Sequence, residues 1–367
     1  VGDTRLEALT TYAISRDDRL PRKALLLFGL SRLPDGLTQA RYPSRDVQVI
    51  APFALWWVGM VHDYALWRSD RAFAAALLPG VRAVLDGFLA YVDAGDLLQA
   101  PPGWNFADWI EAWPIGVPPD GFSGCSGLLQ WHLVYTLGLA TRLEEWVGDP
   151  LSAQRWESRR GRLAAAAKAH FWDDARGLFA DDLPHTSFSE HAQCLAILSG
   201  VLEGAQRDRT AQNLLGDPSL IRTTIYFTHY LFETYRVLEQ PEALFGRLGL
   251  WFDLPAQGFK TTPEQPEPSR SDCHGWGAHP LYHFFGTLLG IRPAAPGFAE
   301  VEIKPMPGEL TELAGEMVHP RGTIAVDLHF AAGHVRGSVV LPERLRGTFC
   351  YGGKTIELRP GMQAIEI

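Results

Sequence analysis

The chain has 367 residues, a formal net charge of −9 and a hydrophobic fraction of 46%. This length allows a large core and more than one domain, whereas the acidic balance, without clustered lysine and arginine, argues against a nucleic-acid partner. The longest apolar stretches, such as 51–60, are shorter than the roughly 20 residues of a membrane-spanning helix, so we expect no membrane partner. Four widely spaced cysteines without a CxxC pair, and no visible signal peptide, favour a cytoplasmic protein without a metal or cofactor.

Residues 4 to 290 predict one helix after another, joined by loops rich in glycine, proline and tryptophan. Short helical patterns occur around Leu6 and Leu25, and longer ones over 51–67, 72–92, 128–146, 151–171, 188–202, 205–214, 221–238, 241–252 and 281–289. The helices come in pairs but share no strict sequence period, which disfavours a solenoid of identical repeats. We therefore predict a mainly α fold, an (α/α)6 toroid of helical hairpins over residues 1–290.

The composition changes after Gly290. A proline-rich segment is followed by period-two runs with glycine between them, over 323–330, 334–341, 347–351, 355–358 and 363–367. Such runs predict short strands with tight turns. We expect residues 291–367 to form a small antiparallel β-sandwich that supports the helical domain.

The loop from Thr261 to Pro280 combines three carboxylates, two histidines, an arginine and a tryptophan. It is too polar for a core and too aromatic for a plain surface linker. We interpret it as one wall of a site for a polar, ring-shaped ligand, and a sugar fits that description. Glu264, Glu267 and His274 are its candidate residues.

A second aromatic loop contains Trp104, Asp108, Trp109, Glu111 and Trp113. Flat indoles can stack on a pyranose while carboxylates accept hydrogen bonds from its hydroxyls, so Trp104, Asp108, Trp109 and Trp113 are candidates for sugar binding. The alternative is that Trp109 and Trp113 fill the barrel and Asp108 caps a helix.

Three further candidates lie near the apolar helix 51–67. Trp57 belongs to a Trp-Trp pair for which core packing of at least one ring is favoured, whereas Tyr42 and Gln48 precede the helix and could face the same cavity. His62-Asp63-Tyr64, inside the helix, favours a structural hydrogen-bonded set over a metal or catalytic one.

Several motifs together resemble the bacterial α-L-rhamnosidases of glycoside hydrolase family 78. They are Ser31-Arg32-Leu33-Pro34-Asp35-Gly36 to Trp56-Trp57, Phe106-Ala107-Asp108-Trp109, Thr261-Thr262-Pro263-Glu264 with Ser271-Asp272-Cys273-His274, and Gly290-Ile291-Arg292-Pro293 with Pro296-Gly297-Phe298. The resemblance covers nearly the whole chain. It implies a catalytic (α/α)6 barrel, a C-terminal β-sandwich, and inverting hydrolysis of terminal rhamnose or a similar sugar.

The same resemblance implies residue roles. Glu264 matches the general base, although its segment is one residue shorter than the family's, which leaves Glu267 as a competitor. His274 matches a sugar-contacting histidine, and Asp108 with Trp109 matches an Asp-Trp pair of the pocket. Gly2-Asp3 resembles the end of the segment that carries the general acid, so that acid is expected upstream of Val1, with Asp3 contacting sugar or steadying it.

We consider three hypotheses for the activity of the chain. In the first, the chain is a piece of a rhamnosidase with weakened activity. In the second, it is a related barrel glycosidase for another sugar, with Glu7, Asp108 or Glu111 as a substitute acid. In the third, it binds sugar without turnover.

Overall fold

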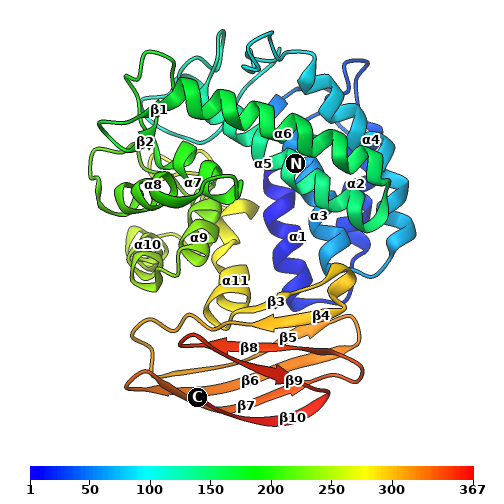
Figure 1. Cartoon of the computed structure of the whole chain (residues 1–367), viewed down its shortest axis with the longest axis vertical. Coiled ribbons are helices and arrows are strands. Elements are labelled where there is room, and N and C mark those ends of the chain that lie inside the picture. Colours follow the sequence, from blue (N-terminus) through cyan, green and yellow to red (C-terminus); the bar gives the residue numbers. More distant parts are fainter.

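The computed structural model describes residues 1–367 and shows a helical ring standing on two small sheets (Figure 1). Six helices form the inner wall of the ring: α1 (Gly2–Ile14), α3 (Ala51–Trp67), α5 (Gly127–Val147), α7 (Glu190–Leu198), α9 (Thr228–Val237) and α11 (Pro280–His283), which continues as a π-helical turn over Phe284–Leu288. Five helices lie outside them: α2 (Arg19–Leu30), α4 (Arg71–Leu89), α6 (Pro150–Phe171), α8 (Gly204–Gly216) and α10 (Pro241–Asp253). The predicted toroid of helical hairpins is confirmed.

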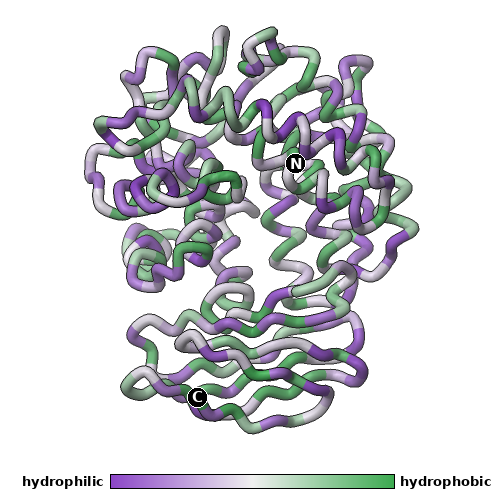
Figure 2. The backbone as a smooth tube through the Cα atoms, in the orientation of Figure 1, coloured by the Kyte–Doolittle hydropathy of each residue, from purple (hydrophilic) through white to green (hydrophobic).

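Burial separates the two rings of helices. Helix α3 buries every residue except Leu66, so it is apolar on all sides, as a helix between two layers must be. The outer helices α2 and α8 bury only one face and turn charged residues to solvent. The hydropathy colouring shows this mixture along the outer helices and the strands (Figure 2).

Short polar side chains set several helix starts. Asp70 accepts a hydrogen bond from the backbone N–H of Phe73 at 2.9 Å, and Asp149 accepts from the N–H groups of Leu151 and Ser152. These caps satisfy N–H groups that the first turn of a helix leaves without partners.

Helix α4 meets the length and apolarity of a membrane span, contrary to the expectation that no segment does. This is weak evidence for a membrane, because core helices of the same composition meet the same test. The helix contains Pro79, and its Arg82 forms a bidentate ion pair with Glu144 of α5, with both N···O distances at 2.7 Å. It therefore packs as an outer helix of the ring.

A two-stranded hairpin, β1 (Trp172–Asp173) and β2 (Leu178–Phe179), follows α6, and two four-stranded sheets form the C-terminal part. One sheet has the order β10 (Gly361–Glu366), β7 (His334–Leu341), β6 (Gly322–Ala331), β5 (Glu312–His319) and is antiparallel throughout. The other has the order β3 (Ile291–Pro293), β4 (Glu300–Ile303), β8 (Arg346–Tyr351), β9 (Lys354–Leu358), and its β4–β8 pair is parallel. Strands β3, β4 and β5 were not predicted.

The junction between ring and sheets is tightly packed. Gly290 has φ 69°, and a side chain there would place its Cβ 1.9 Å from the carbonyl oxygen of Lys304. Phe298 packs edge to face on Trp67, with ring centroids 5.3 Å apart, at the C-terminal end of α3. A single cluster of 91 buried apolar residues includes members of both parts, so the sheets are fixed to one end of the ring. The long loops gather at the other end.

Candidate active site

A cavity of about 310 Å³ lies among the loops at the N-terminal ends of α1 and α3. We call it the aromatic cavity and define it by its lining: Asp3, Ala40, Arg41, Gln48, Ile50, Phe53, Trp104, Phe106, Trp109, Glu264, Arg270, His274 and Trp276. The two loops singled out from the sequence therefore meet here, as predicted. Gln48 lines the cavity too, and Tyr42 does not.

The walls of the cavity are flat aromatic rings. Phe106 and Trp276 are nearly parallel, with an interplanar angle of 6° and centroids 6.2 Å apart, and Trp109 leans against Phe106 at 4.9 Å. Trp104 lies 6.0 Å from Trp109, and its indole N–H donates to the carbonyl of Ile115 at 2.9 Å. Such faces suit the C–H surface of a sugar ring.

Glu264 is the central carboxylate of the cavity. Its side chain is 3% exposed, and its Oε1 accepts from the indole N–H of Trp109 at 3.1 Å. Arg270 donates to both oxygens, at 2.8 and 2.6 Å, and its guanidinium lies 4.5 Å from the centre of the Trp109 ring. The Glu264 carboxylate is therefore buried in a salt bridge with Arg270. The Arg270 side chain is 62% exposed, however, so it covers the cavity from the solvent side.

The loop geometry fixes Glu264. Its backbone N–H donates to the carbonyl of Ser271 at 2.8 Å, and its carbonyl accepts from the indole of Trp276 at 2.7 Å. The competitor Glu267 is exposed, accepts from the N–H of Ser269, and lines a separate cleft beside Trp109. Of the two glutamates, only Glu264 therefore lies in the aromatic cavity.

Asp3 and His274, which also line the aromatic cavity, form an ion pair with an N···O distance of 2.7 Å. Burial would raise the pKa of Asp3, but the hydrogen bond and charge of His274, together with the α-amino group of Val1, lower that pKa. Burial would lower the pKa of His274, but the bond to Asp3 raises it. The pair therefore favours an ionised Asp3. Glu7, one turn along α1, has its pKa raised by burial and by Asp3, yet it does not line the cavity.

Asp108, a sugar-binding candidate from the sequence, lies elsewhere in the structure. It is fully buried and does not line the cavity. Its carboxylate bonds to Nε2 of His191 at 2.9 Å and accepts from the N–H and hydroxyl of Thr224, at 2.7 and 2.5 Å, and from the N–H of Trp109 at 2.9 Å. Every lone-pair direction is used inside the protein. Asp108 therefore positions Trp109 and has no free oxygen for a sugar.

Trp57, Trp113 and Tyr42, also candidates from the sequence, do not line the aromatic cavity. Trp57 is fully buried, and its indole N–H donates to the carbonyl of Leu25 at 3.0 Å. Trp113 is 3% exposed and packs on His191, with ring centroids 4.8 Å apart. Tyr42 is half-buried outside the cavity. Sequence reasoning missed Arg41 and Phe53 as lining residues, since nothing in their local pattern distinguishes them from surface and core positions.

One group of side chains has the composition of a metal site. Nitrogens of His229, His279 and His283 lie within 4.8 Å of one another, and all three rings are buried. Hydrogen bonds already engage them: His283 Nε2 with His229 Nδ1 at 3.1 Å, His283 Nδ1 with the hydroxyl of Thr287, and His279 Nε2 with the carbonyl of Ile225. We interpret the group as a hydrogen-bonded part of the core.

The fold and the loop-built aromatic cavity together define a six-hairpin glycosidase domain with an appended sheet domain. Residues 1–221 match the bacterial alpha-L-rhamnosidase 6 hairpin glycosidase domain family, and residues 290–355 match the bacterial alpha-L-rhamnosidase C-terminal domain family. The chain belongs to the bacterial α-L-rhamnosidase family. No curated protein matches its sequence.

Solved rhamnosidases share the fold. The GH78 family rhamnosidase of Bacillus sp. GL1 is 25% identical, with a TM-score of 0.86 over 95% of this chain and 38% of its own. The rhamnosidase of Klebsiella oxytoca with rhamnose bound is 24% identical, with a TM-score of 0.67 over 77% of this chain and 57% of its own. The Streptomyces avermitilis α-L-rhamnosidase complexed with L-rhamnose is 17% identical, with a TM-score of 0.81 over all of this chain and 38% of its own. This chain thus spans well under two thirds of each.

Proposed function

We propose that the chain is the catalytic barrel of an inverting glycoside hydrolase that removes terminal α-L-rhamnose, or a similar sugar, from glycosides. The observation that carries the proposal is the position of Glu264, a buried carboxylate held by the Trp109 indole inside an aromatic cavity. The family and the rhamnose complexes of two structural relatives support the choice of sugar.

Glu264 takes the role of general base. In an inverting enzyme, a carboxylate removes a proton from water as that water attacks the anomeric carbon, on the face opposite the leaving group. The guanidinium of Arg270 and the indole of Trp109 donate hydrogen bonds to this carboxylate and hold it in place. Because Arg270 is largely exposed, we expect sugar and water to displace it from one carboxylate oxygen.

Asp3 and His274 take a binding role. Asp3 and Glu264 are the two carboxylic acids that line the cavity, and the ion pair with His274 keeps Asp3 ionised. An ionised carboxylate accepts hydrogen bonds from sugar hydroxyls but cannot protonate a leaving oxygen. We therefore assign Asp3 to sugar orientation and not to proton donation.

The test uses 2,4-dinitrophenyl α-L-rhamnopyranoside. Its leaving group needs no proton, so the rate of hydrolysis reports on the general base alone. Replacing Glu264→Gln should lower the hydrolysis rate by about 10²–10⁴-fold, the usual contribution of general base catalysis. The matched control is Glu267→Gln, the same change on an exposed neighbour, and we expect it to keep the wild-type rate. A fully active Glu264→Gln variant, or a wild-type protein that leaves this glycoside intact, would contradict the proposal.

A second candidate function, sugar binding without turnover, is favoured by one observation. The ion pair with His274 holds Asp3 in its ionised form, in which it cannot donate a proton to the leaving oxygen. Saturable heat on titration with L-rhamnose, together with no hydrolysis of the dinitrophenyl glycoside, would identify this function. Binding of another monosaccharide in preference to rhamnose would instead identify a barrel for a different sugar.

A further inference from the structure

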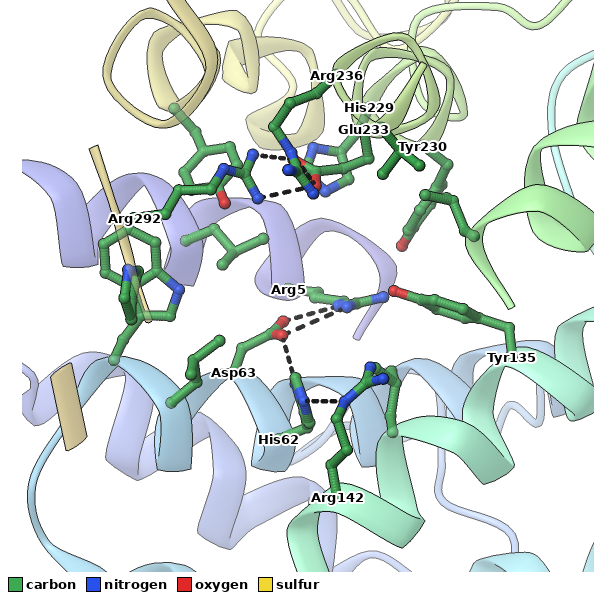
Figure 3. A pocket seen from close by; sticks show the side chains of 18 of the residues that line it. Arg5, His62, Asp63, Tyr135, Arg142, His229, Tyr230, Glu233, Arg236 and Arg292 are labelled. Carbon is green, nitrogen blue, oxygen red and sulfur yellow. Dashed lines mark hydrogen bonds and ion pairs between the residues drawn. The ribbon is translucent and has the colours of Figure 1, made fainter. Parts of the chain in front are cut away.

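A second cavity, also of about 310 Å³, lies at the opposite end of the inner ring, toward the sheets (Figure 3). All six inner helices contribute to it, as do strands β3 and β4, and it shares no lining residue with the aromatic cavity. We call it the charged cavity. Its charged, histidine and tyrosine lining is Arg5, His62, Asp63, Tyr135, Arg142, His229, Tyr230, Glu233, Arg236, Tyr282, Arg292 and Glu302.

Two carboxylates of the charged cavity are already paired. Asp63 accepts from Nε of Arg5 at 2.9 Å and from its Nη2 at 3.4 Å, and both side chains are at most 10% exposed. Glu233 accepts from the guanidinium of Arg292, with one N···O distance of 2.9 Å. Figure 3 shows the two pairs in different parts of the cavity, Arg292 with Glu233 above and Arg5 with Asp63 below. Asp63 and Glu233 therefore have partners without any ligand, whereas the side chain of Glu302, the third carboxylate of the lining, forms no hydrogen bond or ion pair.

Several donors of the cavity are left over. Arg142 makes a single long hydrogen bond, from Nε to His62 at 3.5 Å, and Arg236 makes a single one, from Nε to Glu233 at 3.4 Å. The terminal nitrogens of both guanidinium groups thus have no protein acceptor. Nη1 of Arg5 and the hydroxyl of Tyr230 are buried without a hydrogen bond of regular geometry, although the two side chains lie next to each other. Buried polar groups normally have partners, so Arg5 Nη1 and the Tyr230 hydroxyl call for one, and the partly exposed guanidinium groups of Arg142 and Arg236 can donate to the same acceptor.

The charged residues of the lining also favour an anion. Four arginines face three carboxylates, while burial lowers the pKa of His62, and burial lowers that of His229 to about 4, so both rings are neutral near pH 7. Burial and the neighbouring Arg292 also lower the pKa of Arg236, which shows how closely the positive groups are crowded. The cavity is thus positive inside a protein of net charge −9.

We propose that the charged cavity is a binding site for a small oxyanion: phosphate, sulfate or a small carboxylate. Planar guanidinium groups and hydroxyls are the donors that recognise such oxygens, and a partly desolvated site strengthens each bond. The volume equals that of about ten waters at roughly 30 Å³ each, enough for a tetrahedral oxyanion with part of its hydration shell. Arg142 is exposed and marks the entrance.

The test is titration calorimetry and thermal unfolding with inorganic phosphate, in a buffer free of other oxyanions. We expect one saturable site and a melting temperature that rises with phosphate concentration, because the ligand binds only the folded state. Sulfate and succinate form separate arms that distinguish an inorganic anion from a carboxylate. Chloride, which cannot accept a fork of hydrogen bonds, should bind at least tenfold more weakly.

Two variants locate the site. Arg142→Gln removes an entrance guanidinium with one long hydrogen bond and should weaken phosphate binding at least tenfold. Arg359→Gln, the same change of charge at an exposed position beyond β9, should leave binding unchanged. Tyr230→Phe keeps the ring stacked on Trp56, whose centroid lies 4.1 Å away, and should weaken binding roughly fivefold by loss of one donor.

Two results would contradict the oxyanion proposal. No saturable binding of any of the three oxyanions up to roughly 10 mM would mean that the cavity holds water alone. Equal losses in Arg142→Gln and Arg359→Gln would reduce the effect to general electrostatics. Either result would overturn the proposal, and neither bears on hydrolysis in the aromatic cavity.

Discussion

The two ends of the inner ring carry cavities of equal volume and opposite chemistry. The aromatic cavity, at the N-terminal ends of the inner helices, is built mainly by loops that present indoles around Glu264. The charged cavity, at the other end, is lined mainly by helix side chains, which include three of its four arginines and two of its three carboxylates. The inner helices are thus a common scaffold, and the side chains at each end determine which ligand can bind there.

The largest expected effect concerns the support of the charged cavity. Asp63→Ala should lower the free energy of unfolding by about 3–5 kcal/mol, because it leaves the buried Arg5 guanidinium unpaired. Denaturant unfolding measures this loss. Leu20→Ala, a change at an exposed helix position, serves as the baseline. A loss below about 1 kcal/mol would show that water replaces the carboxylate.

The same pair should give an acid-sensitive stability. Burial would raise the pKa of Asp63, but Arg5 and His62 lower it to about 2. The pKa in the unfolded chain is about 3.9, so the contribution is complete above that pH and disappears as the pH falls toward 2. Unfolding measured between pH 5 and 2 should show this decline in the wild type and a flatter profile in Asp63→Asn.

The support of the aromatic cavity should be the next most sensitive element. Asp108→Asn keeps the size of the side chain but replaces one accepting oxygen with a donor that faces Thr224 or His191. We expect a loss of about 1–3 kcal/mol in the free energy of unfolding and weaker sugar binding through a displaced Trp109. Unchanged stability would mean that the four hydrogen bonds are not all made in solution.

A smaller effect isolates the indole N–H that holds the base. Trp109→Phe keeps an aromatic face and removes the 3.1 Å hydrogen bond to Glu264. Hydrolysis of the dinitrophenyl glycoside should fall by about tenfold, the cost of one hydrogen bond to a charged group. Trp104→Phe, whose N–H bonds only to the carbonyl of Ile115, should change the rate less. The reverse order would place the sugar against Trp104.

The smallest expected effect is a pH dependence of sugar binding. Because Asp3 raises the pKa of His274, the charged pair is complete below the ordinary histidine pKa and disappears as the pH rises through the raised value. Sugar affinity should therefore decline on the alkaline side, and His274→Gln should remove this decline. An affinity that is flat between pH 6 and 9 in the wild type would argue against a role for the pair.

The sequence was most informative where local pattern and tertiary environment agree. Helix α3 was predicted with its observed ends because an all-round apolar run with Pro52 in its first turn leaves little choice. The predicted helix over 221–238 begins only at Thr228, since the N–H and hydroxyl of Thr224 are diverted to the Asp108 carboxylate. Strands β3 and β4 went unpredicted among prolines because they pair with each other and with β8, far away in sequence.

The site shows the same limit. The two loops and Glu264 could be found from composition, because indoles and carboxylates gather there in segments without helical periodicity. Asp108 faces inward because it bonds to His191, a residue of another segment. Arg270 covers Glu264 because the loop between them folds back on itself. The charged cavity escaped notice because its residues are scattered singly over helices, where His62-Asp63 was interpreted as structural.

The proposed hydrolysis requires that water attacks the sugar from the side of Glu264. Proton NMR of the first product formed from 2,4-dinitrophenyl α-L-rhamnopyranoside tests this claim. We predict that β-L-rhamnose appears first and then mutarotates, and that the signal nearly vanishes in Glu264→Gln. First appearance of the α anomer, or formation of product independent of Glu264, would contradict the account.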